Sequence, residues 1–131
     1  MTGRNILAWC LLLAGIGCGD SEQPLQQPVP AAGTNPIEYP VSMWDRRLEG
    51  ETLLLVHVDE FGNVDSAYVD RTSGHPEFDA AAVTGARKLQ FTPGKRGEHV
   101  ISMWTRLPVR FALDSTASVG MPLPPDSARQ R

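Results

Sequence analysis

The residues of this chain best suited to binding a metal or transferring a proton are its three histidines, His57, His75 and His99. None of them stands at metal-ligand spacing from another. His57 and His99 could meet across neighbouring strands, but such a pair is weak grounds for a zinc site. We therefore predict no metal centre and no cofactor.

The segment "DEFGNVD", residues 59–65, loosely resembles a calcium-binding loop. Its oxygen-bearing side chains are Asp59, Glu60, Asn63 and Asp65. It lacks the ligand period and the closing Glu of an EF-hand. Gly62 followed by Asn63 is instead typical of the turn of a hairpin, which is what we expect here.

Candidate nucleophiles lack the neighbours that catalysis requires. Ser73 and Ser102 have no plausible histidine and acid beside them, and "TSGH", residues 72–75, is typical of the start of a helix. "TPGKRG", residues 92–97, lacks the Walker pattern of a phosphate-binding loop. The net charge of −3 gives no basic face for nucleic acid. We predict neither an enzyme nor a nucleic-acid-binding protein.

The N-terminal segment has the layout of an export signal. Residues 6–16 are uncharged and mostly apolar, but this run is shorter than the roughly 20 residues that a membrane-spanning helix needs. Gly15 and Gly17 precede Cys18, which resembles the lipoprotein signal of bacteria, although Gly15 stands where that signal usually has Leu. Lipidation at Cys18, simple cleavage and a retained anchor all remain open. Each places the rest of the chain outside the cytoplasm, on the periplasmic side of a bacterial envelope membrane if the lipoprotein resemblance holds.

Composition divides the chain into four segments. A signal peptide covers residues 1–18, and a Pro- and Gln-rich tether covers residues 19–35. A folded domain covers residues 36–113, and a tail of residues 114–131 has the composition of a disordered segment.

Hydrophobic periodicity predicts five elements within the folded domain. A helix starts at Pro40, with Val41, Trp44 and Leu48 at helical spacing. Strands over residues 52–59 and 64–72 form a hairpin, a second helix starts near Pro76, and a long strand covers residues 99–113. We expect an α+β fold of two layers, in which a three-stranded antiparallel sheet packs with two helices.

Pro108 constrains the position of that last strand. Proline has no N–H to donate to a neighbouring strand, so we expect this strand at a sheet edge or with that side facing solvent.

The order of these elements and several short motifs resemble the C-terminal domain of TonB, the energy transducer of bacterial outer-membrane transport. The similarity covers "EYP" (residues 38–40), "RLEGETLLLVHVDEFGNVDSAYV" (47–69), "FDAAAVTGARKLQFTPGKRG" (78–97) and "LPVRFAL" (107–113). The Tyr-Pro pair, the Glu-Gly before the first strand and the Phe-x-Pro-Gly after the second helix form the recurring pattern.

The resemblance implies protein binding rather than catalysis. In that family the domain captures an extended periplasmic segment of an outer-membrane transporter, which adds as a strand to the sheet edge. Here that edge would be residues 99–113, with residues 38–40 nearby. The implied partner-binding residues are Glu38, Tyr39, Pro40, His99, Val100, Ile101, Ser102, Met103, Trp104 and Thr105. Alternatively, Tyr39 and Pro40 only fasten the first helix to the core.

One face of the predicted sheet departs from the family pattern, because it is apolar where the family is usually polar. Leu53 and Leu55 lie on it with His57 beyond, and alternation places Tyr68, Val100 and Trp104 on the same side. This face is either an apolar interface or a surface covered by the tail or the first helix.

Three functions follow from the resemblance. The first is a lipid-anchored module that binds a partner strand passively, and we favour it because the apolar run carries no His or charge for engaging a proton-driven motor. The second is an energy transducer between such a motor and an outer-membrane transporter. The third is a homodimer joined through edge strands.

Overall fold

A computed structural model describes residues 22–33 and 35–120; the side chains of Ser115 and Thr116 are not part of the description. The N-terminal run with Cys18 lies outside these residues. Within them, no helix has the length and apolar character needed to span a membrane.

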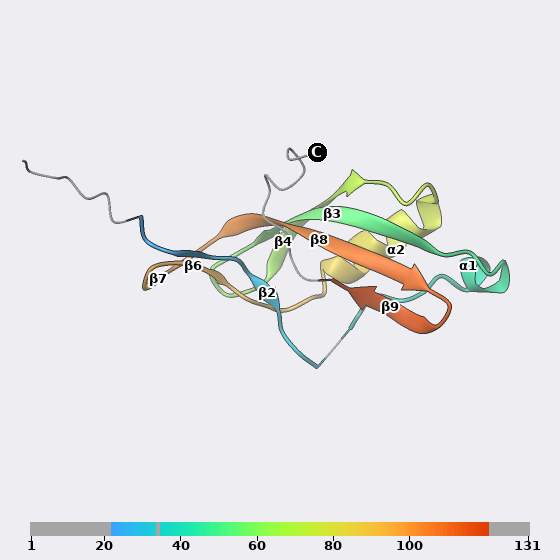
Figure 1. The fold of residues 1–131 in the computed structure, drawn as a ribbon, viewed down its shortest axis with the longest axis horizontal. Coiled ribbons are helices and arrows are strands. Elements are labelled where there is room, and N and C mark those ends of the chain that lie inside the picture. The colour runs from blue at the N-terminus through green and yellow to red at the C-terminus, as the bar shows by residue number, and fades with distance from the viewer. Residues whose placement is uncertain (1–21, 34, 121–131) are drawn as a thin grey trace, which may run out of the picture.

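A four-stranded antiparallel sheet forms the centre of the molecule (Figure 1). Its order is β4 (Val64–Arg71), β3 (Gly50–Val58), β8 (Met103–Ala112) and β9 (Ser115–Val119). β3 and β8 pair without a register shift from Gly50↔Phe111 to Val58↔Met103. The hairpin of β3 and β4 is the one expected, with its turn at Gly62 in the left-handed region (φ 86°).

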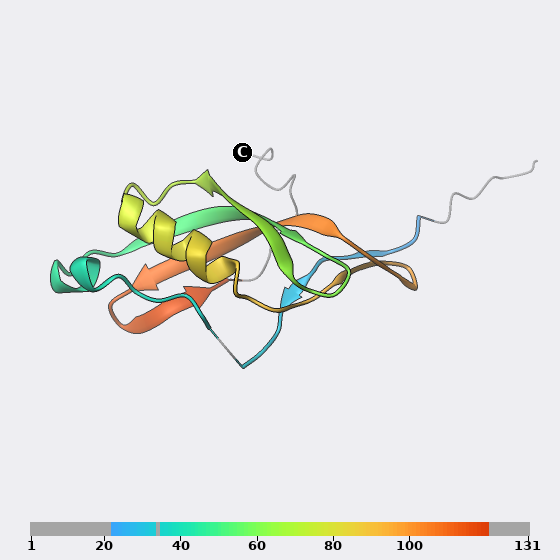
Figure 2. The same cartoon turned by 180° about the vertical axis from the view of Figure 1, so that it is seen from behind.

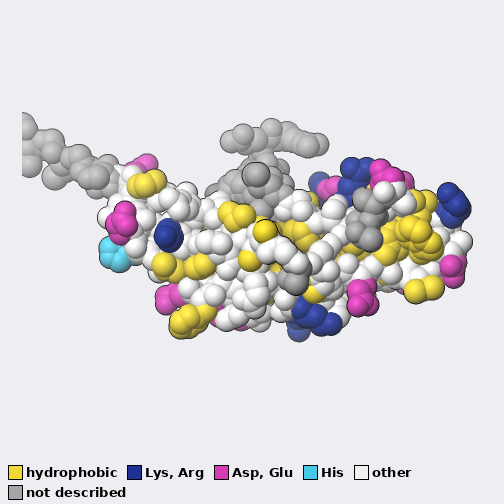
Figure 3. All heavy atoms as spheres, turned by 90° about the horizontal axis from the view of Figure 1, so that it is seen from below, with side chains coloured by type: hydrophobic (Ala, Val, Ile, Leu, Met, Phe, Trp, Pro, Cys, Tyr) yellow, Lys and Arg dark blue, Asp and Glu magenta, His cyan; other side chains and the backbone are white. Residues whose placement is uncertain are grey.

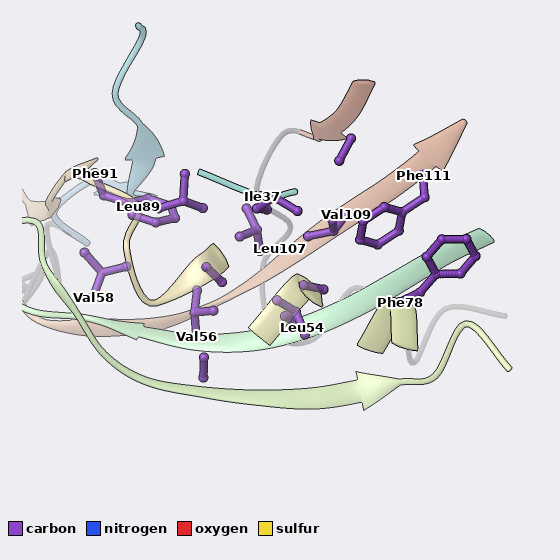
Figure 4. Packing of buried hydrophobic residues seen from close by; sticks show 14 of the residues in the cluster. Ile37, Leu54, Val56, Val58, Phe78, Leu89, Phe91, Leu107, Val109 and Phe111 are labelled. Atoms are coloured by element: carbon purple, nitrogen blue, oxygen red, sulfur yellow. The ribbon is translucent and has the colours of Figure 1, made fainter. Parts of the chain in front are cut away.

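Helix α2 (Pro76–Ala86) lies across one face of this sheet (Figure 2). Its buried side includes Phe78, Ala82 and Ala86, as the helical spacing predicts. These residues meet alternate side chains of β3 and β8, and together they form the core (Figure 4). The two-layer α+β fold is therefore confirmed.

Helix α1 (Val41–Asp45) is a single short turn and buries a different side from the one predicted. Val41 is 73% exposed and Trp44 is 47% exposed, whereas Met43 is fully buried. A five-residue helix at the end of the sheet contacts the core through one residue, so an apolar stripe cannot form along it.

The fourth strand, β9, was not predicted, and it lies in the segment expected to be a disordered tail. It pairs with β8 through Val119↔Val109, Arg110↔Ser118 and Ala112↔Ser115. Ala117 is 1% exposed, and its carbonyl accepts a hydrogen bond from the Asn35 side chain. Pairing with β8 and the burial of Ala117 order this segment as a strand, although its small and polar residues give little local signal for one.

The last predicted strand is therefore not an edge strand along its C-terminal half. Pro108 is nevertheless compatible with an inner strand. It lies just beyond the last β8–β9 pair, and the Gly120 N–H donates to its carbonyl at 2.8 Å. The N–H that proline lacks would point to the same side as that carbonyl. The β3 ladder therefore loses no donor.

Two small sheets extend the molecule at the end opposite α1 (Figure 1). One pairs β1 (Leu25–Gln26), β6 (Gly94–Arg96) and β7 (His99–Ile101), and the other pairs β2 (Val29–Pro30) with β5 (Phe91–Thr92). The long strand predicted over residues 99–113 is thus divided at Ser102. Four residues of the expected tether form β1 and β2, and Pro28 between them is fully buried.

Candidate protein-binding surfaces

The predicted partner-binding residues fall into two groups at opposite ends of β8. Residues 38–40 lie at the end where Phe111 pairs with Gly50, whereas Met103 pairs with Val58 at the other end. A ten-residue strand spans about 30 Å, so the two groups do not form one site.

Tyr39 is packed into the core rather than presented to a partner. Its ring makes edge contacts with Trp44, Phe78 and Phe111, at centroid distances of 5.2, 5.5 and 5.6 Å. Its hydroxyl donates a hydrogen bond to the Leu48 carbonyl. Burial, and then the nearby charge of Glu49, raise the pKa of Tyr39.

Pro40 also has a structural role, since its carbonyl accepts the N–H groups of Met43 and Trp44 and so starts α1. Of the three residues of "EYP", Glu38 alone has an exposed side chain. The structure thus favours the alternative in which Tyr39 and Pro40 fasten the first helix.

The second group is divided between two sheets. His99 and Val100 are exposed on the β6–β7 hairpin, which turns at Gly97 (φ 59°). Met103 is half-buried at the start of β8, and the Thr105 side chain is fully buried on the core side. Thr105 therefore contributes only main-chain groups to any surface.

The face of the sheet away from α2 carries an aromatic cluster of His57, Tyr68 and Trp104. The Trp104 ring lies 5.0 Å from that of His57 and 6.0 Å from that of Tyr68, centroid to centroid. These residues come from β3, β4 and β8, so the alternation that placed them on one side is confirmed.

Three other features of this face differ from the sequence expectation or add to it. Val100 does not share the face, because β7 belongs to another sheet. Leu53 is only 7% exposed and Leu55 is half-buried, whereas Tyr68 is 59% exposed. Charged groups border the cluster: His57 Nδ1 lies 2.8 Å from an Asp65 oxygen, and Arg106 Nε donates to Asp70 at 2.7 Å. The exposed part of the cluster is therefore aromatic rather than aliphatic.

Exposed apolar groups also occur at the end of the molecule that carries α1. Figure 3 shows hydrophobic atoms gathered at its right-hand end, among charged side chains. Val41 and Trp44 are the exposed hydrophobic residues of α1.

A groove between α2 and the edge strand β4 was not predicted. It has a volume of about 670 Å³, and the residues that line it are Val69, Asp79, Ala80, Val83, Thr84, Arg87 and Lys88. The sequence contains no signal for it: Val69 lies on the helix-covered side of β4, and that it stays 41% exposed is evident only in the structure.

Asp79 lines this groove, and its carboxylate accepts several hydrogen bonds. Its carboxylate accepts bonds from the hydroxyls of Thr52 (2.8 Å), Thr72 and Ser73 (2.9 Å) and from the Ser73 N–H (2.9 Å). Burial by itself would raise the pKa of Asp79, but the hydrogen bonds outweigh it and lower the pKa. This network fixes the start of α2 against β3.

The segment 59–65, which loosely resembles a calcium-binding loop, forms the hairpin turn. Asp59 accepts hydrogen bonds from the N–H groups of Phe61 and Asn63, as a turn residue does. These bonds, with that of Asn63 the largest cause, lower the pKa of Asp59. Over the described part of the chain, no three His, Cys, Asp or Glu side chains are grouped so that they could hold a metal ion.

Comparison of the sequence with known proteins gives matches that agree on one family. Residues 35–113 match the family model described as the Gram-negative bacterial TonB protein C-terminal. Protein tonB2 of Pseudomonas aeruginosa is 37% identical over 77 residues, which are 59% of this chain and 28% of that protein. Protein TonB of Xanthomonas campestris pv. campestris is 35% identical over 80 residues, which are 61% of this chain and 36% of that protein. The match thus spans about a third of the length of these relatives.

Proposed function

Since this chain belongs to the TonB C-terminal domain family, we propose that it is a periplasmic protein-binding module that captures an extended segment of an envelope protein by β-strand addition. The family consists of binding and energy-transducing proteins, not enzymes. The proposed partner is the periplasmic segment of an outer-membrane transporter.

The observation that carries this proposal is the unequal pairing of β8 on its two sides. β3 pairs with it along nine residue pairs, whereas β9 pairs at three and has a register shift between Arg110 and Ala112. A segment arriving beside β8 can therefore extend β9 or replace it with little loss of main-chain hydrogen bonding. Its own N–H and C=O groups would then complete the sheet, as in other cases of strand addition.

Side chains on the open face would add specificity to this main-chain pairing. Trp104 lies on the half of β8 that does not pair with β9. Its ring stacks on that of Tyr68, so the two residues form a continuous aromatic surface. Aromatic rings supply large contact areas at low entropic cost, which makes them suitable for partner recognition. We include in the proposed interface Leu55, which pairs with Tyr68, and Leu53, which lies two residues before it on the same face of β3.

We further propose that the domain is held to an envelope membrane by a lipid on Cys18. Passive binding fits such an anchor, because a lipid offers no contact to a proton-driven motor. Energy coupling is the second candidate, and the relatives named TonB favour it. A Cys18→Ala variant tests the anchor: labelling with a radioactive fatty acid should disappear and the protein should leave the membrane fraction.

Site-specific photo-crosslinking in cells tests the binding function. A photoreactive residue at the exposed positions His99, Val100 and Trp104 should give adducts with a transporter, and one at Arg46, which is exposed on α1's C-terminal side, should not. Adducts with a second copy of this chain would favour the homodimer instead. Adducts with an inner-membrane motor would favour the transducer, and the lack of any adduct would refute strand capture here.

A further inference from the structure

The edge of the sheet opposite β9 has the features of a second, separate binding site. β4 is the outermost strand on that side, and it pairs with β3 alone. Among the described residues, no backbone hydrogen bond joins β4 to a segment other than β3. Such an edge offers N–H and C=O groups to an incoming strand.

Two β-bulges limit how much of this edge is regular. The β3–β4 register shifts between Leu53 and Leu54 and again between His57 and Val58. Between the shifts, residues 66–69 form an undisturbed stretch. Bulges protect natural sheet edges from indiscriminate pairing, so this edge suits a short segment rather than a long strand.

The groove beside β4 would receive alternate side chains of that segment. Val69 of β4 and Ala80 and Val83 of α2 form its apolar wall. Tyr68, which precedes Val69 on β4, points to the other face and is 59% exposed. The incoming segment would therefore place small aliphatic side chains in the groove and the intervening ones beside Tyr68.

The two ends of the groove carry opposite charges, which bear on the direction in which a segment would bind. Asp79 lies at one end with its oxygens already hydrogen-bonded. Arg87 and Lys88 lie at the other end, both exposed, and neither forms an ion pair with another described residue. This cationic end adjoins the start of β4, because Gln90 pairs with Asn63.

The end of α2 also indicates which anion would bind there. A helix C-terminus presents carbonyl groups, not the N–H groups that cradle a terminal carboxylate. The two cationic side chains therefore carry the anion binding at this end, and they suit an acidic side chain. A segment that runs antiparallel to β4 brings its C-terminal end to Arg87 and Lys88.

We propose that the β4–α2 groove binds a short extended protein segment, antiparallel to β4, with small aliphatic residues followed by an acidic residue. The site lies across the sheet from β8, so it goes beyond the proposed function and lets one domain hold two segments at once. It does not depend on strand capture at β8.

A defined peptide tests this site. The probe is a short amidated peptide with alternating Val and Thr residues and one Glu near its C-terminal end, titrated into the isotopically labelled full chain. We expect backbone amide shifts to change in residues 66–69 and along α2. Replacing the peptide Glu by Gln should weaken binding about threefold, as expected for an exposed ion pair.

Charge reversal supplies the control. In the double variant Arg87→Glu and Lys88→Glu, the Glu peptide should lose its advantage over the Gln peptide. The matched variant Lys95→Glu and Arg96→Glu changes the net charge equally on the distant β6 strand and should keep that advantage. Shift changes confined to β8 and β9 would overturn this site while supporting strand capture at β8. If no amide shift changes at millimolar peptide concentration, the β4–α2 site is refuted. Strand capture at β8 would not be affected, because crosslinking tests it separately.

Discussion

The rings of Phe78 and Phe111 stack in parallel, with centroids 4.6 Å apart and an interplanar angle of 16°. Phe78 comes from the first turn of α2 and Phe111 from the end of β8, and both are fully buried (Figure 4). This contact joins the helix layer to the sheet at the end where Tyr39 packs edge-on against both rings. It fixes the first turn of α2 to the end of β8.

Replacing Phe111 by alanine should therefore destabilise the whole domain. The substitution removes a stacked ring and leaves a cavity among large residues, for which a loss of about 3–5 kcal/mol in the free energy of unfolding is expected. Chemical denaturation followed by tryptophan fluorescence measures it. Val41→Ala, at a residue that is 73% exposed, is the control and should change stability by less than about 0.5 kcal/mol.

The hydrogen bonds to Asp79 predict a pH dependence of stability. Because folding lowers the pKa of this carboxyl group, its contribution is complete above the unfolded-state pKa, near 3.9, and is lost as the pH falls through the folded pKa. Asp79→Asn should thus cost about 1–2 kcal/mol at neutral pH and less below pH about 4. Denaturation curves over this pH range would contradict the assignment if the cost were the same throughout.

Tyr39 allows the structural and partner-binding roles to be separated. Tyr39→Phe keeps the three ring contacts but removes the hydroxyl that donates to the Leu48 carbonyl. A loss of about 1 kcal/mol in unfolding free energy is expected, with no change in crosslinking at His99 or Trp104. If the variant kept full stability but lost partner adducts, Tyr39 would belong to the binding surface after all.

The sequence predicts well those elements whose side chains carry a strong period. The hairpin turn at Gly62, the start of α2 at Pro76 and the buried positions of β3 and β8 all follow from turn chemistry and alternation. β9 and the two short strands of the tether do not. β9 consists mostly of small and polar residues, β1 and β2 have two residues each, and all three are ordered by pairing with other segments. Local pattern cannot show such pairing.

The candidate sites show the same division. Alternation correctly placed Tyr68 and Trp104 on one face, since both lie in regular parts of the sheet. It wrongly joined Val100 to them, because the break at Ser102 moves that residue into a separate hairpin. The β4–α2 groove depends on how a helix lies along a sheet edge, and that is a tertiary feature.

Gly85 provides a test in which helix propensity and packing predict opposite signs. By propensity alone, Gly85→Ala in α2 should stabilise the protein by up to about 1 kcal/mol. In the structure, a Cβ at this position would lie 2.5 Å from Ile37 Cγ1 and 2.7 Å from Ile37 Cα. Because the second contact is with backbone, a change of rotamer cannot relieve it.

We therefore expect Gly85→Ala to destabilise the domain by about 1–3 kcal/mol, the usual cost of overpacking. Thr84→Ala, on the neighbouring exposed position of the same helix, is the control and should stabilise slightly, because only propensity acts there. Thermal denaturation of the two variants and the unmodified chain shows whether each substitution raises or lowers the stability of the domain. A stabilised Gly85→Ala variant would show that residues 35–37 do not pack as closely against α2 as the structure has them.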